Sequence, residues 1–239
     1  MNIAIIFAGG TGIRMRSRGL PKQFLEVHGK PIISYTIENF ERNRHIESII
    51  VVCLESYIKR MKCIAVQAGF TKIVDVIAGG TTGQESIYNG LCFARKIFSL
   101  NDIVLIHDGV RPLISDDLIT QCIKTTQKFG NAITVSPAME TIVTIDEEGI
   151  NYAIFNRDQC FHAKAPQTFF LKDILSAHER AIKDGYIGAI DSASLMKYYN
   201  MPLHFVRNDA NNIKITTPAD FYIFRALLEA KENVQILGV

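Results

Sequence analysis

The chain has 239 residues, of which 48% are hydrophobic and 21% are charged, and its formal net charge is +2. This composition is typical of a soluble globular protein, and the small charge argues against nucleic acid or a membrane surface as a partner. No apolar run reaches the roughly 18 residues of a membrane span. The five cysteines form no C-x-x-C pair, and no basic leader precedes the first apolar run. We therefore expect a cytoplasmic protein with reduced thiols.

The first apolar run, residues 3–8, predicts a buried parallel strand. It ends in a glycine-rich loop, Ala8-Gly9-Gly10-Thr11-Gly12. Glycines let a ligand approach main-chain N–H groups, which bind anions and above all phosphates. Arg14 and Lys22 add positive charge beside the loop. The dinucleotide motif G-x-G-x-x-G fails because Met15 stands at its third glycine, and the P-loop string is absent. The alternative is an ordinary glycine-rich turn with two surface cations.

Strand and helix patterns alternate along the chain. Further apolar runs of strand length are expected at 46–54, 73–77, 102–107, 132–137 and 204–206. Helical spacing is expected at 32–40, 57–68, after the loop 78–86 as far as 98, and at 116–129, 172–183, 191–200 and 218–231. Ser115 is a suitable N-cap for the helix at 116–129, and Gly130 a suitable residue just past its end. The alternation predicts an α/β fold, a single Rossmann-like domain with a mainly parallel twisted sheet.

Ligands of such sheets bind at the carboxyl ends of the strands. The glycine-rich loop, the Gly79–Ser86 loop and Asp108 each follow an expected strand, so they should lie at one edge. Residues 140–155 differ, because they read as strand, turn and strand. A hairpin inserted into an α/β chain is either a decorated edge or an arm that grips a partner.

The loop Ala8-Gly9-Gly10-Thr-Gly-Ile-Arg14-Met15, with Pro21-Lys22-Gln23, resembles the nucleotidyltransferases that join a nucleoside triphosphate to a phosphorylated sugar or polyol. The chain is most similar to the cytidylyltransferases acting on methylerythritol 4-phosphate or ribitol 5-phosphate, over nearly its whole length. The resemblance implies that CTP and a polyol phosphate give a CDP-polyol and pyrophosphate, with Mg²⁺ as cofactor. It also implies one domain over residues 1–239 and a homodimer held by a hairpin arm at about 138–160.

The resemblance assigns roles to several charged residues. Arg14 and Lys22 would stabilise the triphosphate and the departing pyrophosphate, and Lys214 would lie near the α-phosphate. Asp108 would hold the metal. Independently of the resemblance, the neighbouring Arg111 is expected to hold the loop through a carboxylate. Phosphoryl chemistry needs alignment and charge neutralisation more than covalent help, which suits these residue types. The alternatives are solvated surface cations and, for Asp108, a turn or cap role.

The residues matched to nucleotide binding lie in two loops: Ala8, Gly9, Gly10, Thr11 and Gly12, then Gly79, Gly80 and Ser86. For the acceptor, Thr141, Arg157 and Lys214 would contact its phosphate, with Arg157 serving the neighbouring subunit. Asp191 would contact its hydroxyl groups, or could equally cap the helix that it precedes. His107 is expected to pack beneath the metal ligand.

Some positions depart from the resembled pattern. Gly83 replaces a usual arginine of the cytosine-binding loop, which leaves the strictness of CTP selection open. Asn211 and Glu140 each replace an aspartate that is usual in the methylerythritol enzymes. These replacements favour D-ribitol 5-phosphate as acceptor. The alternative acceptor is 2-C-methyl-D-erythritol 4-phosphate, which would place the protein in isoprenoid precursor synthesis.

Two other classes of protein could share part of this pattern. A sugar-1-phosphate nucleotidyltransferase would share the first loop, but the hairpin with Arg157 argues against it. A non-catalytic nucleotide-binding protein would not need to keep Arg14, Lys22, Asp108 and Lys214 together.

Overall fold

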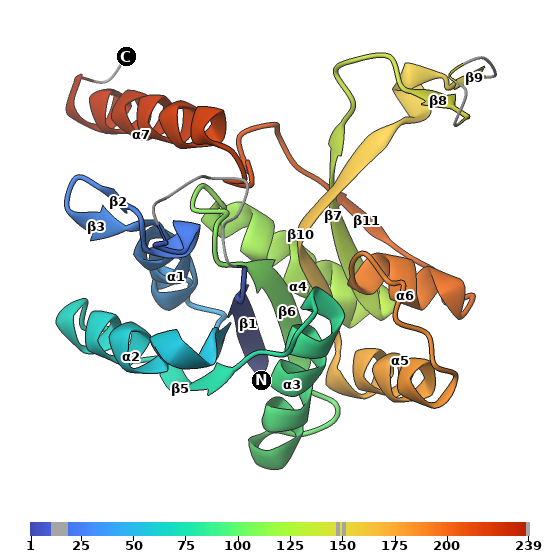
Figure 1. The fold of residues 1–239 in the computed structure, drawn as a ribbon, viewed down its shortest axis with the longest axis horizontal. Coiled ribbons are helices and arrows are strands. Elements are labelled where there is room, and N and C mark those ends of the chain that lie inside the picture. Colours follow the sequence, from blue (N-terminus) through green and yellow to red (C-terminus); the bar gives the residue numbers. More distant parts are fainter. Residues whose placement is uncertain (11–18, 147–148, 150–151, 238–239) are drawn as a thin grey trace.

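The fold is built on one seven-stranded sheet, seen in a computed structural model that describes residues 1–10, 19–146, 149 and 152–237 (Figure 1). Its strands lie in the order β11-β7-β10-β6-β1-β4-β5. They are β1 (Asn2–Ala8), β4 (Ser48–Cys53), β5 (Ile73–Ala78), β6 (Ile103–Asp108), β7 (Asn131–Pro137), β10 (Phe161–Phe170) and β11 (Phe205–Arg207). The neighbours β5, β4, β1 and β6 are parallel, and β10 runs antiparallel to both β6 and β7. The expected α/β class and mainly parallel sheet are confirmed.

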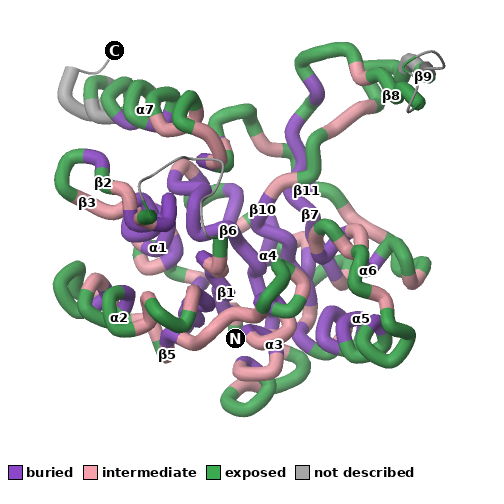
Figure 2. The backbone as a smooth tube through the Cα atoms, in the orientation of Figure 1, coloured by how far each residue is buried: buried purple, intermediate pink, exposed green. Residues whose placement is uncertain are grey.

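Helices cover both faces of the sheet because alternate side chains of each strand point to opposite faces. On one face Ala4 and Ile6 of β1 pack in a core with residues of α1 (Ile32–Arg42), α2 (Ile58–Gln67) and α4 (Asp116–Phe129). On the other face Ile3 and Ile5 pack with residues of α3 (Gly83–Ile97), α5 (Leu171–Lys183) and α6 (Ser192–Tyr198). Figure 2 shows the strands as the buried centre of the molecule. Hydrophobic residues thus occupy both faces of the parallel strands.

A third, smaller core lies at the edge where the parallel strands end. Helix α7 (Pro218–Leu237) places Phe224 and Leu228 against Val27 of the short ladder β2 (Glu26–Val27) and β3 (Lys30–Pro31). Ile215 joins this core, and its N–H donates to the carbonyl of Val110 at 2.9 Å. The packing carries the 212–215 segment to the end of β6.

Local signals set the helix ends as expected. The Oγ of Ser115 accepts a hydrogen bond from the N–H of Leu118 at 3.3 Å, and Gly130 has φ of 95° at the other end of α4. Only glycine adopts that left-handed conformation without strain. The C-terminal helix is longer than the expected 218–231, since it continues to Leu237. None of the helices in the described part of the chain combines the length and apolarity needed to cross a membrane.

Strand β10 was not among the expected strands. Its central Pro166 has no N–H to give to a ladder, which is why proline normally argues against a strand interior. The structure accommodates it at an irregularity, because the β10–β7 register shifts between Ala163 and Gln167. The Oγ1 of Thr134 donates to the carbonyl of Pro166 at 2.7 Å and so links the two strands there.

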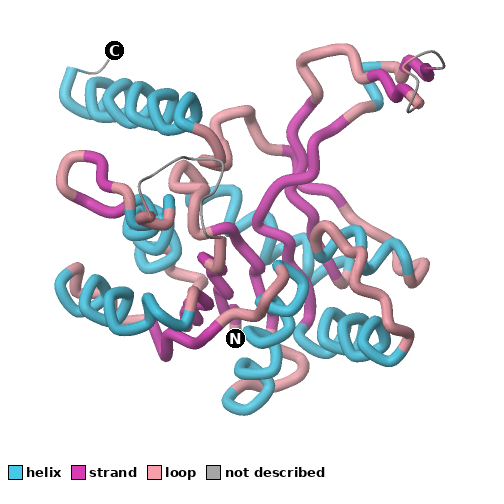
Figure 3. The backbone as a smooth tube through the Cα atoms, in the orientation of Figure 1, coloured by secondary structure: helices cyan, strands magenta, loops and turns pink. Residues whose placement is uncertain are grey.

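The predicted hairpin is present. Strands β8 (Val143–Ile145) and β9 (Tyr152–Ile154) pair antiparallel, and Figures 1 and 3 show them at the tip of an arm that extends away from the sheet. Apolar side chains along this hairpin arm are exposed: Met139 by 74%, Ile145 by 67% and Phe155 by 45%. Exposed apolar groups gathered on one projection are typical of a surface that contacts another molecule. The homodimer remains a prediction.

Candidate active site

Two cavities meet at the carboxyl edge of the parallel strands. The loop cavity, about 370 Å³, is lined by Gly9, Gly10, Lys22, Gly80 and Ser86, among others. The β10 cavity, about 310 Å³, is lined by Arg111, Lys164, Gln167 and Asp191, among others. Both are lined by Phe7, Gly83, Asp108 and Lys214. The carboxylate of Asp108 and the ammonium group of Lys214 therefore lie where the two cavities join.

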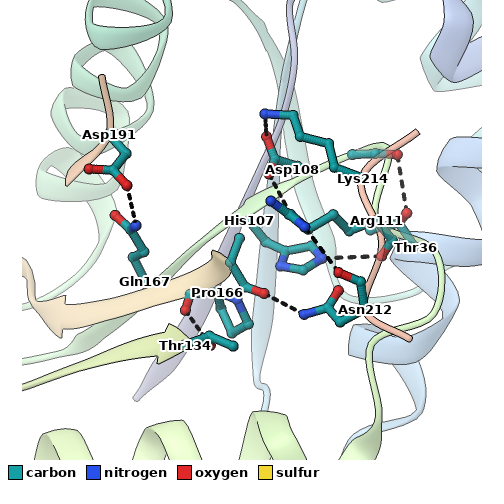
Figure 4. Close-up of polar contacts among 12 residues, drawn as sticks. Thr36, His107, Asp108, Arg111, Thr134, Pro166, Gln167, Asp191, Asn212 and Lys214 are labelled. Atoms are coloured by element: carbon teal, nitrogen blue, oxygen red, sulfur yellow. Dashed lines mark hydrogen bonds and ion pairs between the residues drawn. The ribbon is translucent and has the colours of Figure 1, made fainter. Parts of the chain in front are cut away.

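Asp108, the last residue of β6, is held between two cations (Figure 4). Its Oδ1 lies 2.7 Å from Lys214 Nζ, and its Oδ2 accepts from Arg111 Nε at 2.7 Å. The side chain of Asp108 is only 8% exposed. Burial alone would raise its pKa, but Lys214 and Arg111 outweigh burial and lower the pKa of Asp108 to about 2. The carboxyl group of Asp108 is therefore ionised at neutral pH.

A network of buried hydrogen bonds fixes this group in place. Arg111 Nη1 donates to the carbonyl of Asn212 at 3.0 Å, and Asn212 Nδ2 donates to the carbonyl of Ala165 at 2.7 Å (Figure 4). Asn212 is 1% exposed. The loop after β6, strand β10 and the 212–215 segment are thereby tied together. Arg111 makes the expected contact with a carboxylate, and that carboxylate is Asp108.

His107 packs beneath Asp108, as expected. Its ring lies 5.0 Å from that of Phe40, and its Nε2 is 3.3 Å from the carbonyl oxygen of Arg111. The side chain is fully buried. Burial lowers its pKa to about 4, so the imidazole is neutral at pH 7 and contributes packing rather than charge.

The loop cavity brings Lys22 to the same edge as Asp108 and Lys214. Lys22 is 9% exposed, and the neighbouring Gln23 donates from Nε2 to the carbonyl of Ala8 at 2.6 Å. The side chain of Gln23 therefore ties the residues around Lys22 to the end of β1. Some predicted site residues lie outside the described residues: Thr11, Gly12 and Arg14.

The Gly79–Ser86 loop is organised by its own side chains. Ser86 Oγ accepts from the N–H of Gly80 at 3.0 Å and donates to the carbonyl of Thr82 at 2.8 Å. A Cβ on Gly79 would lie 2.8 Å from Ser86 Oγ, so this close approach requires glycine. A Cβ on Gly83 would meet nothing within 4 Å. Gly83, where the resemblance leads us to expect an arginine, therefore borders open space at the junction of the two cavities.

Asp191 lines the β10 cavity and also caps α6. Its Oδ1 accepts from the N–H of Ser194 at 2.7 Å, which confirms the capping alternative. Its Oδ2 accepts from Gln167 Nε2 at 2.8 Å (Figure 4). Gln167 Oε1 in turn accepts from the N–H of Ala193 at 2.8 Å. Gln167 is buried and sets the position of Asp191 above the cavity.

Thr141 and Arg157 are not brought to the two cavities within one chain. Both are exposed residues of the hairpin arm, and Arg157 begins a short turn, Arg157–Gln159, after β9. Neither lines the loop cavity or the β10 cavity. Asn211, one of the positions that favoured the acceptor, is also exposed and lines neither cavity.

Sequence reasoning missed Lys164, Gln167 and Asn212 as site residues. Lys164 and Gln167 lie on the unexpected strand β10, and Asn212 acts through contacts with residues distant in sequence. The motif Ala-Pro-Gln, within a segment of unassigned structure, was the available signal for Gln167.

A mainly parallel sheet whose strand ends hold a glycine-rich loop and a cation-paired carboxylate defines the nucleotide-binding class of α/β proteins. The family model of 2-C-methyl-D-erythritol 4-phosphate cytidylyltransferase matches residues 2–230, and the chain belongs to this cytidylyltransferase family. The protein is therefore a nucleotidyltransferase.

Relatives divide between two names. The chain is 48% identical to ribitol-5-phosphate cytidylyltransferase of Vibrio parahaemolyticus, with 100% of both chains covered. It is 37% identical to 2-C-methyl-D-erythritol 4-phosphate cytidylyltransferase of Clostridium acetobutylicum, covering 98% of this chain and 100% of that one. Among solved structures, 4-diphosphocytidyl-2C-methyl-D-erythritol synthase from Anaerococcus prevotii superposes with a TM-score of 0.82 at 27% identity, over 95% of this chain and 96% of that chain.

Proposed function

We propose that this protein transfers the cytidylyl group of CTP to D-ribitol 5-phosphate, giving CDP-ribitol and pyrophosphate. The observation that carries the proposal is the junction of two cavities at Asp108 and Lys214. One cavity is bordered by glycine-rich loops suited to a nucleotide, and the other by polar groups suited to a polyol. The choice of acceptor is supported by full-length relatives at 47–48% identity that are named for ribitol 5-phosphate. The proposal includes a cytoplasmic location, which is supported by the five cysteines, all of them free thiols.

In the proposed reaction a phosphate oxygen of the acceptor attacks the α-phosphorus of CTP, and the bond to the pyrophosphate oxygen breaks. The acceptor phosphate lies at the junction, from which it reaches the α-phosphate in the loop cavity. Lys214 neutralises charge that develops on the α-phosphate, and Lys22 and Arg14 neutralise the leaving pyrophosphate. Gly9, Gly10 and Gly80 offer close main-chain approach to the nucleotide.

The residues present suit a divalent cation bound together with a nucleotide. Mg²⁺ takes one or two protein carboxylates and completes its shell with phosphate oxygens and water. Asp108 offers such a carboxylate, and the described residues contain no cluster of three His, Cys, Asp or Glu side chains that would hold an ion alone. Lys214, whose side chain is 41% exposed, is free to leave Oδ1 for the α-phosphate. The cation would supply further neutralisation of the triphosphate.

The first experiment measures pyrophosphate release with CTP and Mg²⁺, offering ribitol 5-phosphate and methylerythritol 4-phosphate in parallel. Faster turnover of ribitol 5-phosphate supports the proposal. Preference for methylerythritol 4-phosphate would refute ribitol 5-phosphate as the acceptor, while the proposal of cytidylyl transfer would stand. EDTA should abolish release and added Mg²⁺ restore it; full activity in EDTA would exclude the proposed role of Asp108.

The proposal includes a homodimer in which Arg157 of the hairpin arm serves the partner's site, because Arg157 lines neither cavity of its own chain. Arg157→Ala subunits mixed with Lys22→Ala subunits would then form one intact site per heterodimer. Recovered activity in purified heterodimers is expected. Heterodimers as inactive as their parents would show that Arg157 does not act across the dimer.

A further inference from the structure

Lys164 is a third cation of the β10 cavity, beside Arg111 and Lys214. It projects from the irregular part of β10, between Ala163 and Ala165, which line the same cavity. Its Nζ donates to the carbonyl of Ala210 at 3.2 Å. An ammonium has three N–H donors, so this bond leaves two for other partners.

The surroundings of Lys164 disfavour an ammonium without a partner. The side chain is partly buried, and burial together with the nearby Arg111 lowers its pKa, although the charge of Asp209 acts in the opposite direction. Water can solvate the remaining donors while the cavity holds water. Once a ligand displaces that water, each donor needs an acceptor atom of the ligand or remains unpaired at a cost.

The position of Lys164 indicates which part of the acceptor it meets. The reacting phosphate must lie near Asp108 and Lys214, which line both cavities, because the α-phosphate is reached from there. Lys164 lines the β10 cavity and not the loop cavity. It therefore faces the part of the acceptor beyond the phosphate, which is the polyol chain.

We propose that Lys164 is a specificity-determining residue that donates a hydrogen bond to a hydroxyl group of the polyol. It thereby selects ribitol 5-phosphate over 2-C-methyl-D-erythritol 4-phosphate, because the latter has a shorter carbon chain with one hydroxyl group fewer and so leaves the ammonium unpaired. Asp191, fixed by Gln167 in the same cavity, complements Lys164 because its carboxylate accepts hydrogen bonds that hydroxyl groups donate. This inference rests on the proposed function and adds the basis of acceptor choice.

The test is Lys164→Met, which keeps the length of the side chain and removes its donors. We expect kcat/KM for ribitol 5-phosphate to fall about 10- to 100-fold, the range for one hydrogen bond to a charged group. For methylerythritol 4-phosphate it should change less than about 3-fold, and the KM for CTP should stay within about 2-fold. Lys164→Arg keeps a charged hydrogen-bond donor, so it should retain part of the preference for ribitol 5-phosphate that Lys164→Met loses.

The matched control is Lys172→Met, because Lys172 is the second residue of α5 and its Nζ donates to Asn101 Oδ1 at 3.1 Å, outside both cavities. This variant should keep both acceptor activities and the acceptor ratio. Lys164 also braces Ala210, and loss of that brace alone would reduce turnover of both acceptors equally and raise the KM for CTP. The ratio of the two kcat/KM values therefore separates hydroxyl recognition from bracing.

Each outcome decides the matter. The inference is supported if Lys164→Met lowers the ratio of kcat/KM for ribitol 5-phosphate to kcat/KM for methylerythritol 4-phosphate and leaves the KM for CTP unchanged. Equal losses for both acceptors, or no loss for either, overturn it while the proposed function stands. Wild-type protein that prefers methylerythritol 4-phosphate, or turns over neither acceptor, overturns the proposed function first and the inference with it.

Discussion

Replacing Asp108 by asparagine would remove the negative charge that Lys214 and Arg111 share while keeping the shape of the side chain. The pKa of Asp108 falls from 3.8 to about 2 in the folded protein. Since one pKa unit corresponds to about 1.4 kcal/mol, the folded state favours the ionised form by roughly 2 kcal/mol. Removing one partner of a buried ion pair costs about 3–5 kcal/mol, because the other charge is left uncompensated. We therefore expect Asp108→Asn to lower the free energy of unfolding by about 2–5 kcal/mol.

Urea denaturation followed by circular dichroism measures this loss. A carboxyl group with a lowered folded pKa stabilises the protein above its unfolded pKa of 3.8, and this contribution disappears as the pH falls through about 2. The difference in the free energy of unfolding between wild type and Asp108→Asn should thus be constant from pH 8 to 5 and become smaller below pH 4. A variant within about 0.5 kcal/mol of wild type at pH 7, the range of ordinary surface substitutions, would refute the ion-pair reasoning. In the same preparations, pyrophosphate release should fall by at least about 100-fold.

Three further predictions concern the core, the pH response and the hairpin arm. Gly90→Ala should lower the free energy of unfolding by about 1–3 kcal/mol in a denaturant titration, because its Cβ would lie 2.8 Å from Ile5 Cγ2; an unchanged value would contradict the packing of α3 on β1. Burial lowers the pKa of His178 to about 4, so between pH 6.5 and 4 the unfolded chain binds a proton that the folded protein does not. The free energy of unfolding should therefore fall by up to roughly 3 kcal/mol as the pH is lowered from 6.5 to 4. His178→Phe, which preserves stacking on Tyr88, should remove its share of the decline and leave the share of His107, whose pKa is also about 4; an unchanged slope would show that His178 does not contribute. Ile145→Asp on the exposed hairpin arm should shift size-exclusion elution toward the monomer at an unchanged melting temperature of the monomeric fraction, and an unshifted elution would argue against the arm as an interface.

The sequence by itself determined the order of most elements and the edge where the site lies. Runs of apolar residues predicted β1, β4, β5, β6 and β7, because a parallel strand buried on both faces needs a short apolar stretch wherever the chain places it. Ser115 and Gly130 located the ends of α4, because capping is decided within a few residues. Asp108 was found as a polar residue ending an apolar run.

Only the tertiary structure decided what completes the site. Strand β10 forms despite Pro166 because β6 and β7 bind it from both sides, and no local pattern reports those partners. Arg111 and Asn212 meet across 101 positions of sequence, and Gln167 meets Asp191 across 24. Such contacts depend on how the elements pack together, whereas propensity and spacing describe neighbours along the chain. For the same reason neither the β10 cavity nor the place of Lys164 in it could be predicted from the sequence, because both depend on how β10 packs in the sheet.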